Sequence, residues 1–166
     1  MKKFKRILPF LFLFISLFLD RHLTYFLSTL LSYQFVISSH FFLMMLLFFI
    51  LTYSKYLVYF IFLILSFLYD SLYFHGIGIS TFLFPLLIFL GYKWLPLMNY
   101  SKIARVLSFF ILVFIFNIGS YFLALFYHMT SYSFDVFVVY HLLPSLMINL
   151  LFYFFSDFFV NRLHLI

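Results

Sequence analysis

Six apolar stretches, separated by short connections, take up almost the whole of this sequence. They run over about 7–31, 39–53, 56–73, 77–95, 103–127 and 136–160. A helix needs about 20 predominantly apolar residues to cross the hydrocarbon core of a bilayer, and only the second stretch is clearly shorter than that. Helices satisfy their own backbone hydrogen bonds in lipid. The sequence therefore predicts an all-α transmembrane bundle of about six spans, forming one integral membrane domain over residues 1–166.

The scarcity of charge excludes several other classes of protein. Charged residues make up 8% of the chain, against about 25% in a typical soluble domain. A soluble core needs a polar surface around it, so lipid must face most of this chain, and no catalytic domain in water is expected. The basic residues stand in small groups beside apolar stretches rather than on one face, which argues against a nucleic-acid partner. No cysteine is present, so disulfides and thiolate sites are excluded.

The basic residues also predict the topology. They fall before the first stretch and in every second connection after it, as Lys2, Lys3, Lys5, Arg6, Lys55, Lys93, Lys102, Arg105 and Arg162. The connections around 31–38, 71–76 and 128–133 hold no lysine or arginine, and only Arg21 departs from the alternation. Connections rich in lysine and arginine stay in the cytoplasm. Both termini are therefore expected on the cytoplasmic side.

The first stretch carries polar residues deep in the membrane. Ser16, Asp20, Thr24 and Ser28 recur every four residues, which places them on one helical face that should look inward. Arg21 lies about a quarter turn away, so it cannot neutralise Asp20 along that face, and each is expected to find a partner on another helix or subunit. The residues form either a proton or ion site or, as we favour, a buried contact or docking surface for another membrane protein.

Two other stretches carry small and polar residues suited to helix packing. Pro144 lacks the N–H that would bind the carbonyl of Tyr140, so that carbonyl needs another partner. We interpret the polar residues as contacts between helices rather than as a reactive site. They are His141, Ser145 and Asn149 in the last stretch, and Asn117, Gly119 and Ser120 in the fifth.

The connection between the third and fourth stretches is rich in polar residues and glycine. Asp70 approaches the outer membrane interface, and Gly76 and Gly78 allow a tight reversal after it. Pro85 then stands where it can kink the returning helix. We expect a structured hairpin there.

No catalytic residue, metal ligand set or cofactor site is indicated. The serines and histidines show no spacing that selects a nucleophile and its base. The six histidines are far apart and share no ligand spacing with the four carboxylates. The sequence therefore predicts a protein that is not an enzyme.

Several short motifs, in order along nearly the whole chain, resemble the MreD family, the small polytopic rod shape-determining proteins of bacteria. They are Leu19-Asp20-Arg21-His22-Leu23, then Tyr69-Asp70 with Tyr73, Gly76 and Gly78, then Phe84-Pro85-Leu86, and finally the segment from Leu143-Pro144-Ser145 to Asn149. The chain departs from the family at Asn117, where an acidic residue often stands.

The resemblance implies a non-enzymatic scaffold of the cell-elongation machinery in the bacterial cytoplasmic membrane. It implies an MreC-like bitopic partner and, through it, links to the peptidoglycan glycosyltransferase and transpeptidase and to an actin-like filament protein. A homo-oligomer stays open. Family members also resemble the substrate-binding subunits of energy-coupling-factor vitamin transporters, so a small-molecule-binding membrane subunit is the alternative. The candidate partner-binding or buried polar residues are Asp20, Arg21, Asp70, Asn117, His141 and Asn149.

Overall fold

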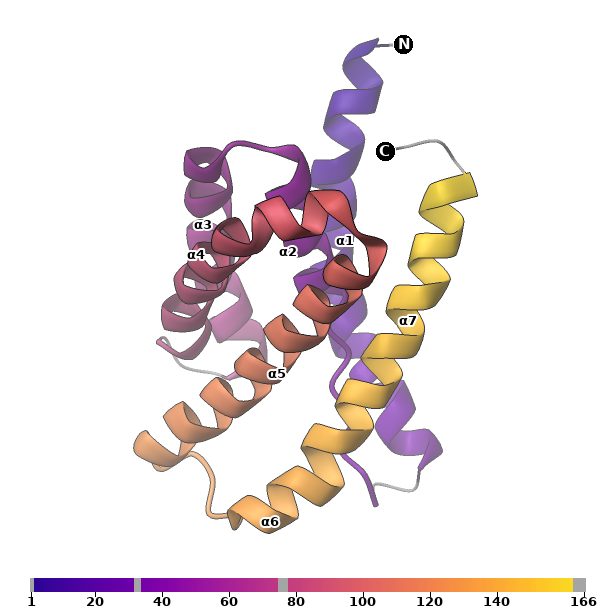
Figure 1. Ribbon diagram of the computed structural model, residues 1–166. Coiled ribbons are helices and arrows are strands. Elements are labelled where there is room, and N and C mark those ends of the chain that lie inside the picture. Colours follow the sequence, from indigo (N-terminus) through magenta and orange to yellow (C-terminus); the bar gives the residue numbers. More distant parts are fainter. Residues whose placement is uncertain (1, 32–33, 75–77, 163–166) are drawn as a thin grey trace.

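The computed structural model describes residues 2–31, 34–74 and 78–162, with side chains over 8–31, 34–74 and 78–155. Helices account for most of these residues, which confirms the all-α membrane bundle. They are α1 (Lys2–Leu30), α2 (Phe41–Thr52), α3 (Lys55–Tyr73), α4 (Ile79–Tyr100), α5 (Lys102–Phe126), α6 (Phe134–Phe137), the π-helical turn η1 (Val138–Leu142) and α7 (Leu143–Arg162) (Figure 1). Because α6, η1 and α7 follow one another directly, they form one long helix with a wide turn in it.

Five helices of the described part are long and apolar enough to cross a membrane. They cover Leu8–Leu30, Lys55–Tyr73, Ile79–Tyr100, Lys102–Phe126 and Phe134–Phe155. α1 continues through Asp20 without a break. The start of α1 and the end of α7 lie at the same end of the bundle, as the predicted topology requires (Figure 1).

The second predicted span has a different form from the other five. Its helix, α2, has only 12 residues, about 18 Å at the usual rise, which is too short to cross a bilayer. Residues 36–40, which precede it, have no regular secondary structure. This segment and α2 together connect the end of α1 to the start of α3 (Figure 1). Part of this connection is therefore non-helical chain inside the bundle.

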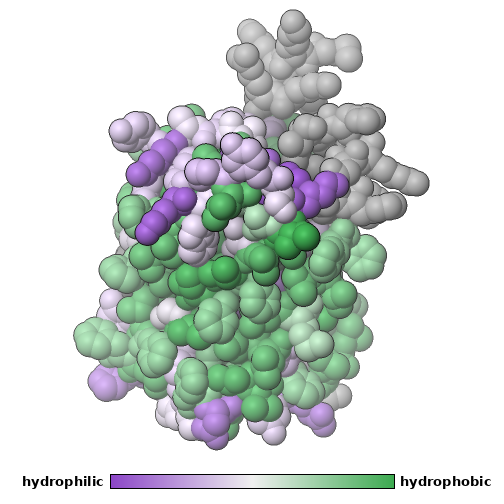
Figure 2. Space-filling model, in the orientation of Figure 1, coloured by the Kyte–Doolittle hydropathy of each residue, from purple (hydrophilic) through white to green (hydrophobic). Residues whose placement is uncertain are grey.

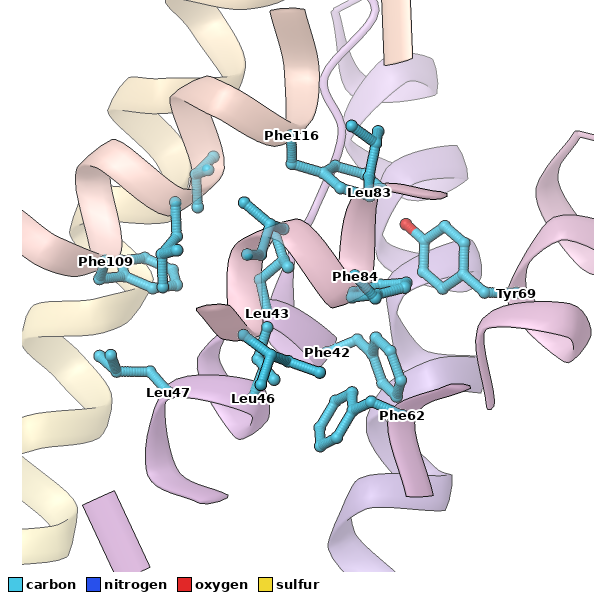
Figure 3. Packing of buried hydrophobic residues seen from close by; sticks show 14 of the residues in the cluster. Phe42, Leu43, Leu46, Leu47, Phe62, Tyr69, Leu83, Phe84, Phe109 and Phe116 are labelled. Carbon is cyan, nitrogen blue, oxygen red and sulfur yellow. The ribbon is translucent and has the colours of Figure 1, made fainter. Parts of the chain in front are cut away.

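α2 lies at the centre of the fold. It packs against α1, α3, α4 and α5, which explains why its sequence is apolar all round rather than on one face. Phe42 on α2 meets Phe62 of α3 and Phe84 of α4, with ring centroids 5.2 Å away in each case (Figure 3). Many of the aromatic residues thus fill the core, while an apolar belt also surrounds the middle of the visible face, with hydrophilic residues at its two ends (Figure 2).

Two glycines contact side chains of a neighbouring helix closely. A Cβ added at Gly91 would lie 2.5 Å from Cδ1 of Ile50, and one added at Gly119 would lie 2.6 Å from Cδ2 of Leu83. A Cβ at either position would therefore force the Ile50 or Leu83 side chain to move. Small residues of this kind let helix backbones approach in a membrane, where packing replaces the hydrophobic effect.

Candidate functional site

Many of the buried polar residues gather around the segment 36–42, where the chain changes from an irregular to a helical path. Backbone N–H and C=O groups of such a segment have no helical partners, and lipid offers none. Non-helical backbone at membrane depth is tolerated only where protein or water satisfies it. We call this region the central polar cluster, defined by Asp20, Thr24, Ser38, Ser39, His40, Asn117, Tyr140, His141, Ser145 and Asn149.

Asp20 of α1 binds the free N-terminus of α2. Its Oδ1 accepts hydrogen bonds from the N–H of Phe41 at 2.6 Å and from the hydroxyl of Ser39 at 3.0 Å, and its Oδ2 accepts one from the N–H of Phe42 at 2.9 Å. The side chain at the N-cap position, His40, makes no capping bond. A carboxylate placed there also meets the positive end of the helix dipole. Asp20, which is fully buried, thus caps a helix other than its own.

The backbone ahead of α2 is held from two sides. From α1, the hydroxyl of Thr24 accepts a hydrogen bond from the N–H of Ser39 at 3.0 Å. From α7, the hydroxyl of Ser145 accepts one from the N–H of Ser38 at 2.9 Å. The Asn149 side chain binds a backbone donor and a backbone acceptor. Its Oδ1 accepts a hydrogen bond from the N–H of His40 and its Nδ2 donates one to the carbonyl of Ser38, each at 2.7 Å. The first and last long helices are therefore joined through this segment.

Pro144 leaves one further hydrogen-bond acceptor free, the backbone carbonyl of Tyr140. The carbonyl of Tyr140, which the proline deprives of its helical donor, accepts a hydrogen bond from the N–H of Val36 at 3.0 Å. The chain widens into the π-helical turn η1 at the same place, and the N–H of Leu143 binds the carbonyl of Val138. The predicted free carbonyl is thus used to hold the irregular segment.

Two imidazoles complete the cluster. Nε2 of His40 lies 3.0 Å from Nδ2 and 3.3 Å from Oδ1 of Asn117, and Nε2 of His141 lies 3.2 Å from the hydroxyl of Ser38. Nδ1 of each ring is buried without a hydrogen-bond partner in the described part of the chain. Asn117 also donates to the carbonyl of Val113, on its own helix, at 2.9 Å.

Asp70 repeats the capping arrangement in the hairpin between α3 and α4. Its Oδ2 accepts hydrogen bonds from the N–H of Gly78 at 2.9 Å and from the N–H of Thr81 at 3.0 Å, while its Oδ1 accepts one from the N–H of Ser80 at 2.5 Å. The hydroxyl of Thr81 adds a bond of 2.8 Å to Oδ2. Gly78 has φ 134°, a conformation that residues with a side chain rarely adopt. Gly76 lies outside the described residues.

The predicted site residues therefore separate into three places. Asp20, Asn117, His141 and Asn149 meet in the central polar cluster, and Pro144 adjoins it. Asp70 and Gly78 form the hairpin cap, while Pro85 lies inside α4, where its carbonyl accepts a hydrogen bond from Tyr59 at 3.2 Å. Arg21 is exposed on the outside of α1.

Sequence reasoning did not single out the segment that these residues bind. Ser38, Ser39 and His40 form a polar triplet directly before a strongly apolar run, which is a signal for the start of a helix. That signal marks the beginning of α2 at Phe41. It carries no information about which side chains satisfy the backbone ahead of it.

A cavity of about 400 Å³ lies beside the central polar cluster, toward the end of the bundle where α1 finishes. Tyr140 and His141 belong to both. The other lining residues come from the segment after α1, from the end of α3, from α5 and from the region around α6, and include Gln34, Phe74, Ser120 and Tyr132. Among the described residues, no group of three or more His, Asp or Glu side chains could hold a metal ion.

Comparisons with known proteins give a consistent result. The family model for the rod shape-determining protein MreD matches residues 4–163. The cell shape-determining protein MreD of Streptococcus pneumoniae (strain ATCC BAA-255 / R6) is 33% identical over 151 residues, which cover 91% of this chain and 92% of that protein. No solved structure matches the chain.

Proposed function

The chain belongs to the MreD family of rod shape-determining proteins, and from this we propose that it is a non-enzymatic membrane scaffold of the bacterial cell-elongation machinery. In this proposal it binds an MreC-like bitopic protein. Through that partner it supports cell shape by lateral peptidoglycan synthesis, alongside the glycosyltransferase, the transpeptidase and the actin-like filament protein.

The observation that carries the proposal is how the buried polar side chains are used. Asp20, Asp70 and Asn149 each bind several backbone groups of this same chain. Their hydrogen bonds hold α1 to α2, α3 to α4, and α7 to the segment before α2. Side chains used in this way fix the arrangement of helices, and a fixed apolar surface is what another membrane protein can bind.

The positions of the basic residues support the proposed orientation in the membrane. Lys55 begins α3, and Lys93 and Lys102 flank the connection from α4 to α5. Both connections lie at the end of the bundle where α1 begins (Figure 1). By the positive-inside rule this end faces the cytoplasm, and so do both termini.

The proposal is tested by copurification of the partner and by the effect of depletion on cell shape. The full chain, tagged and expressed at its native level, should copurify in mild detergent with an MreC-like protein, and its depletion should turn rod-shaped or elongated cells round. A membrane protein of the same size and unrelated family serves as the purification control. Normal shape after depletion, with no partner recovered, contradicts the proposal.

The cavity favours a second candidate, a small-molecule-binding membrane subunit. A space of about 400 Å³ is within the range of ligand pockets, and its lining combines aromatic rings with a few hydroxyl and amide groups. Mass spectrometry of the extracted protein should then find a bound compound, and a vitamin should raise its melting temperature. Replacing Ala124, which lines the cavity, by Phe should abolish that shift. Absence of both signals excludes this candidate.

A further inference from the structure

Arg21 is a cation on the outer surface of α1, near the middle of the membrane-spanning part of that helix. The membrane-spanning part of α1 runs over Leu8–Leu30, so Arg21 stands about 20 Å from one end and about 14 Å from the other at the usual helical rise. Side chains in a helix lean toward its N-terminus, which for Arg21 is the more distant end. The guanidinium therefore leans away from the nearer headgroups.

No acidic side chain in the described part of the chain neutralises Arg21. Asp20 and Asp70 are fully buried, and their oxygens face backbone donors. Asp135 lies in the first turn of α6, where its carboxylate interacts with Ser133. A guanidinium keeps its charge under any physiological condition, and an unpaired charge in lipid is expensive. The described residues offer Arg21 the neutral phenol of Tyr73 but no free carboxylate, so we look for the acidic partner on another molecule.

The surface around Arg21 has the spacing of a helix-packing seam. Leu11, Phe14, Phe18, Arg21 and Tyr25 follow one another at intervals of three and four residues, which is the spacing that keeps one face of a helix against a neighbour. The four uncharged members are 55%, 49%, 57% and 66% exposed in that order. A single polar residue within such a seam selects the partner and its register.

The position of α1 leaves this seam accessible. Within the bundle α1 packs chiefly against α2, whereas α4 packs against α2, α3 and α5. Its buried face, which carries Leu13, Leu17 and Asp20, is turned inward. The seam lies beside that face, and in the described part of the chain its side chains stay exposed.

We propose that the seam of α1 formed by Leu11, Phe14, Phe18, Arg21 and Tyr25 docks a single membrane-spanning helix of another protein, whose carboxylate pairs with Arg21. This inference rests on the proposed scaffold function and adds the place and chemistry of the contact. The aromatic side chains supply packing area, and the ion pair sets the depth at which the two helices align.

Photocrosslinking in native membranes tests the place. A photoreactive phenylalanine analogue is placed at Phe18, which is 57% exposed, and separately at Phe89 of α4 and Phe122 of α5, which are 52% and 55% exposed. The bitopic partner should be captured from position 18 and not from the two control positions. Capture from a control position alone overturns the seam and leaves the scaffold function standing. Capture of lipid or of a second copy of the chain at position 18 overturns it too.

Substitution of Arg21 tests the chemistry. Arg21→Glu should reduce capture from position 18 by more than about tenfold, because two carboxylates would then meet in lipid, and Arg21→Lys should retain most of it. Changing the partner's membrane carboxylate to lysine should restore capture with Arg21→Glu. Arg21→Leu is the folding control, since Arg21 is exposed, and it should leave the melting temperature unchanged while weakening capture. Full capture with Arg21→Leu refutes the ion pair. Loss of copurification for the unsubstituted chain would instead contradict the scaffold function itself, and the inference with it.

Discussion

Replacing Asp20 by alanine should destabilise the whole bundle. The carboxylate accepts hydrogen bonds from the N–H groups of Phe41 and Phe42 and from the hydroxyl of Ser39. The hydroxyl can rotate to another acceptor, but the two N–H groups are fixed at the start of α2. An unsatisfied buried donor costs about 1–3 kcal/mol, so the loss should be about 2–6 kcal/mol. For a chain of this size that corresponds to a melting temperature lower by about 4–24 °C.

The measurement is thermal unfolding of the purified full chain in mild detergent, followed by size-exclusion chromatography. Thr24→Val is the matched comparison, because it removes one acceptor of a single N–H group, that of Ser39, without changing the volume of the side chain. Leu19→Ala, at a position 43% exposed, is the surface control and should have little effect. If Asp20→Ala melts within 1 °C of the unsubstituted chain, or no lower than Thr24→Val, the capping role assigned to Asp20 is refuted.

Three further predictions concern other parts of the fold. Asp70→Ala should raise amide hydrogen exchange at Gly78 and Thr81 by more than about tenfold, because both N–H groups lose their acceptor; unchanged exchange there would contradict the hairpin cap. Pro144→Ala restores a donor that competes for the carbonyl of Tyr140, so exchange at Val36 should quicken, while exchange within α3 should not change. Gly119→Ala places a Cβ against Leu83 and should cost about 1–3 kcal/mol; because Leu83 is buried, Leu83→Ala is itself destabilising, but the double variant should lose less than the sum of the two single variants, and a neutral Gly119→Ala would count against the close approach of α4 and α5.

Much of the candidate site could be predicted from single helices. The four-residue spacing of Asp20 and Thr24, and that of Ser145 and Asn149, indicated inward faces, and the structure directs all four at the same segment. Pro144 indicated a free carbonyl at Tyr140. Helical periodicity sufficed for these conclusions, because a face is a property of one helix.

The sequence located the second apolar stretch but did not predict the form that it takes in the structure. The expected stretch, 39–53, differs little from the bounds of α2, Phe41–Thr52, but it was interpreted as a helix crossing the membrane. Hydrophobicity reports only that a segment avoids water. It does not distinguish a spanning helix from a short one preceded by irregular chain whose polar groups find partners elsewhere.

The sequence by itself determined that this chain is an α-helical membrane protein and which helix faces look inward. Those properties depend on hydrophobicity and periodicity, which add up along one segment. Only the tertiary structure decided what the inward polar residues bind. Their hydrogen bonds join residues up to 111 positions apart, as between Asn149 and Ser38, and such pairs exist only once separate helices have packed. Asp20 is the clearest case, because its place in the sequence indicated burial, while its role as the cap of α2 required the position of another helix.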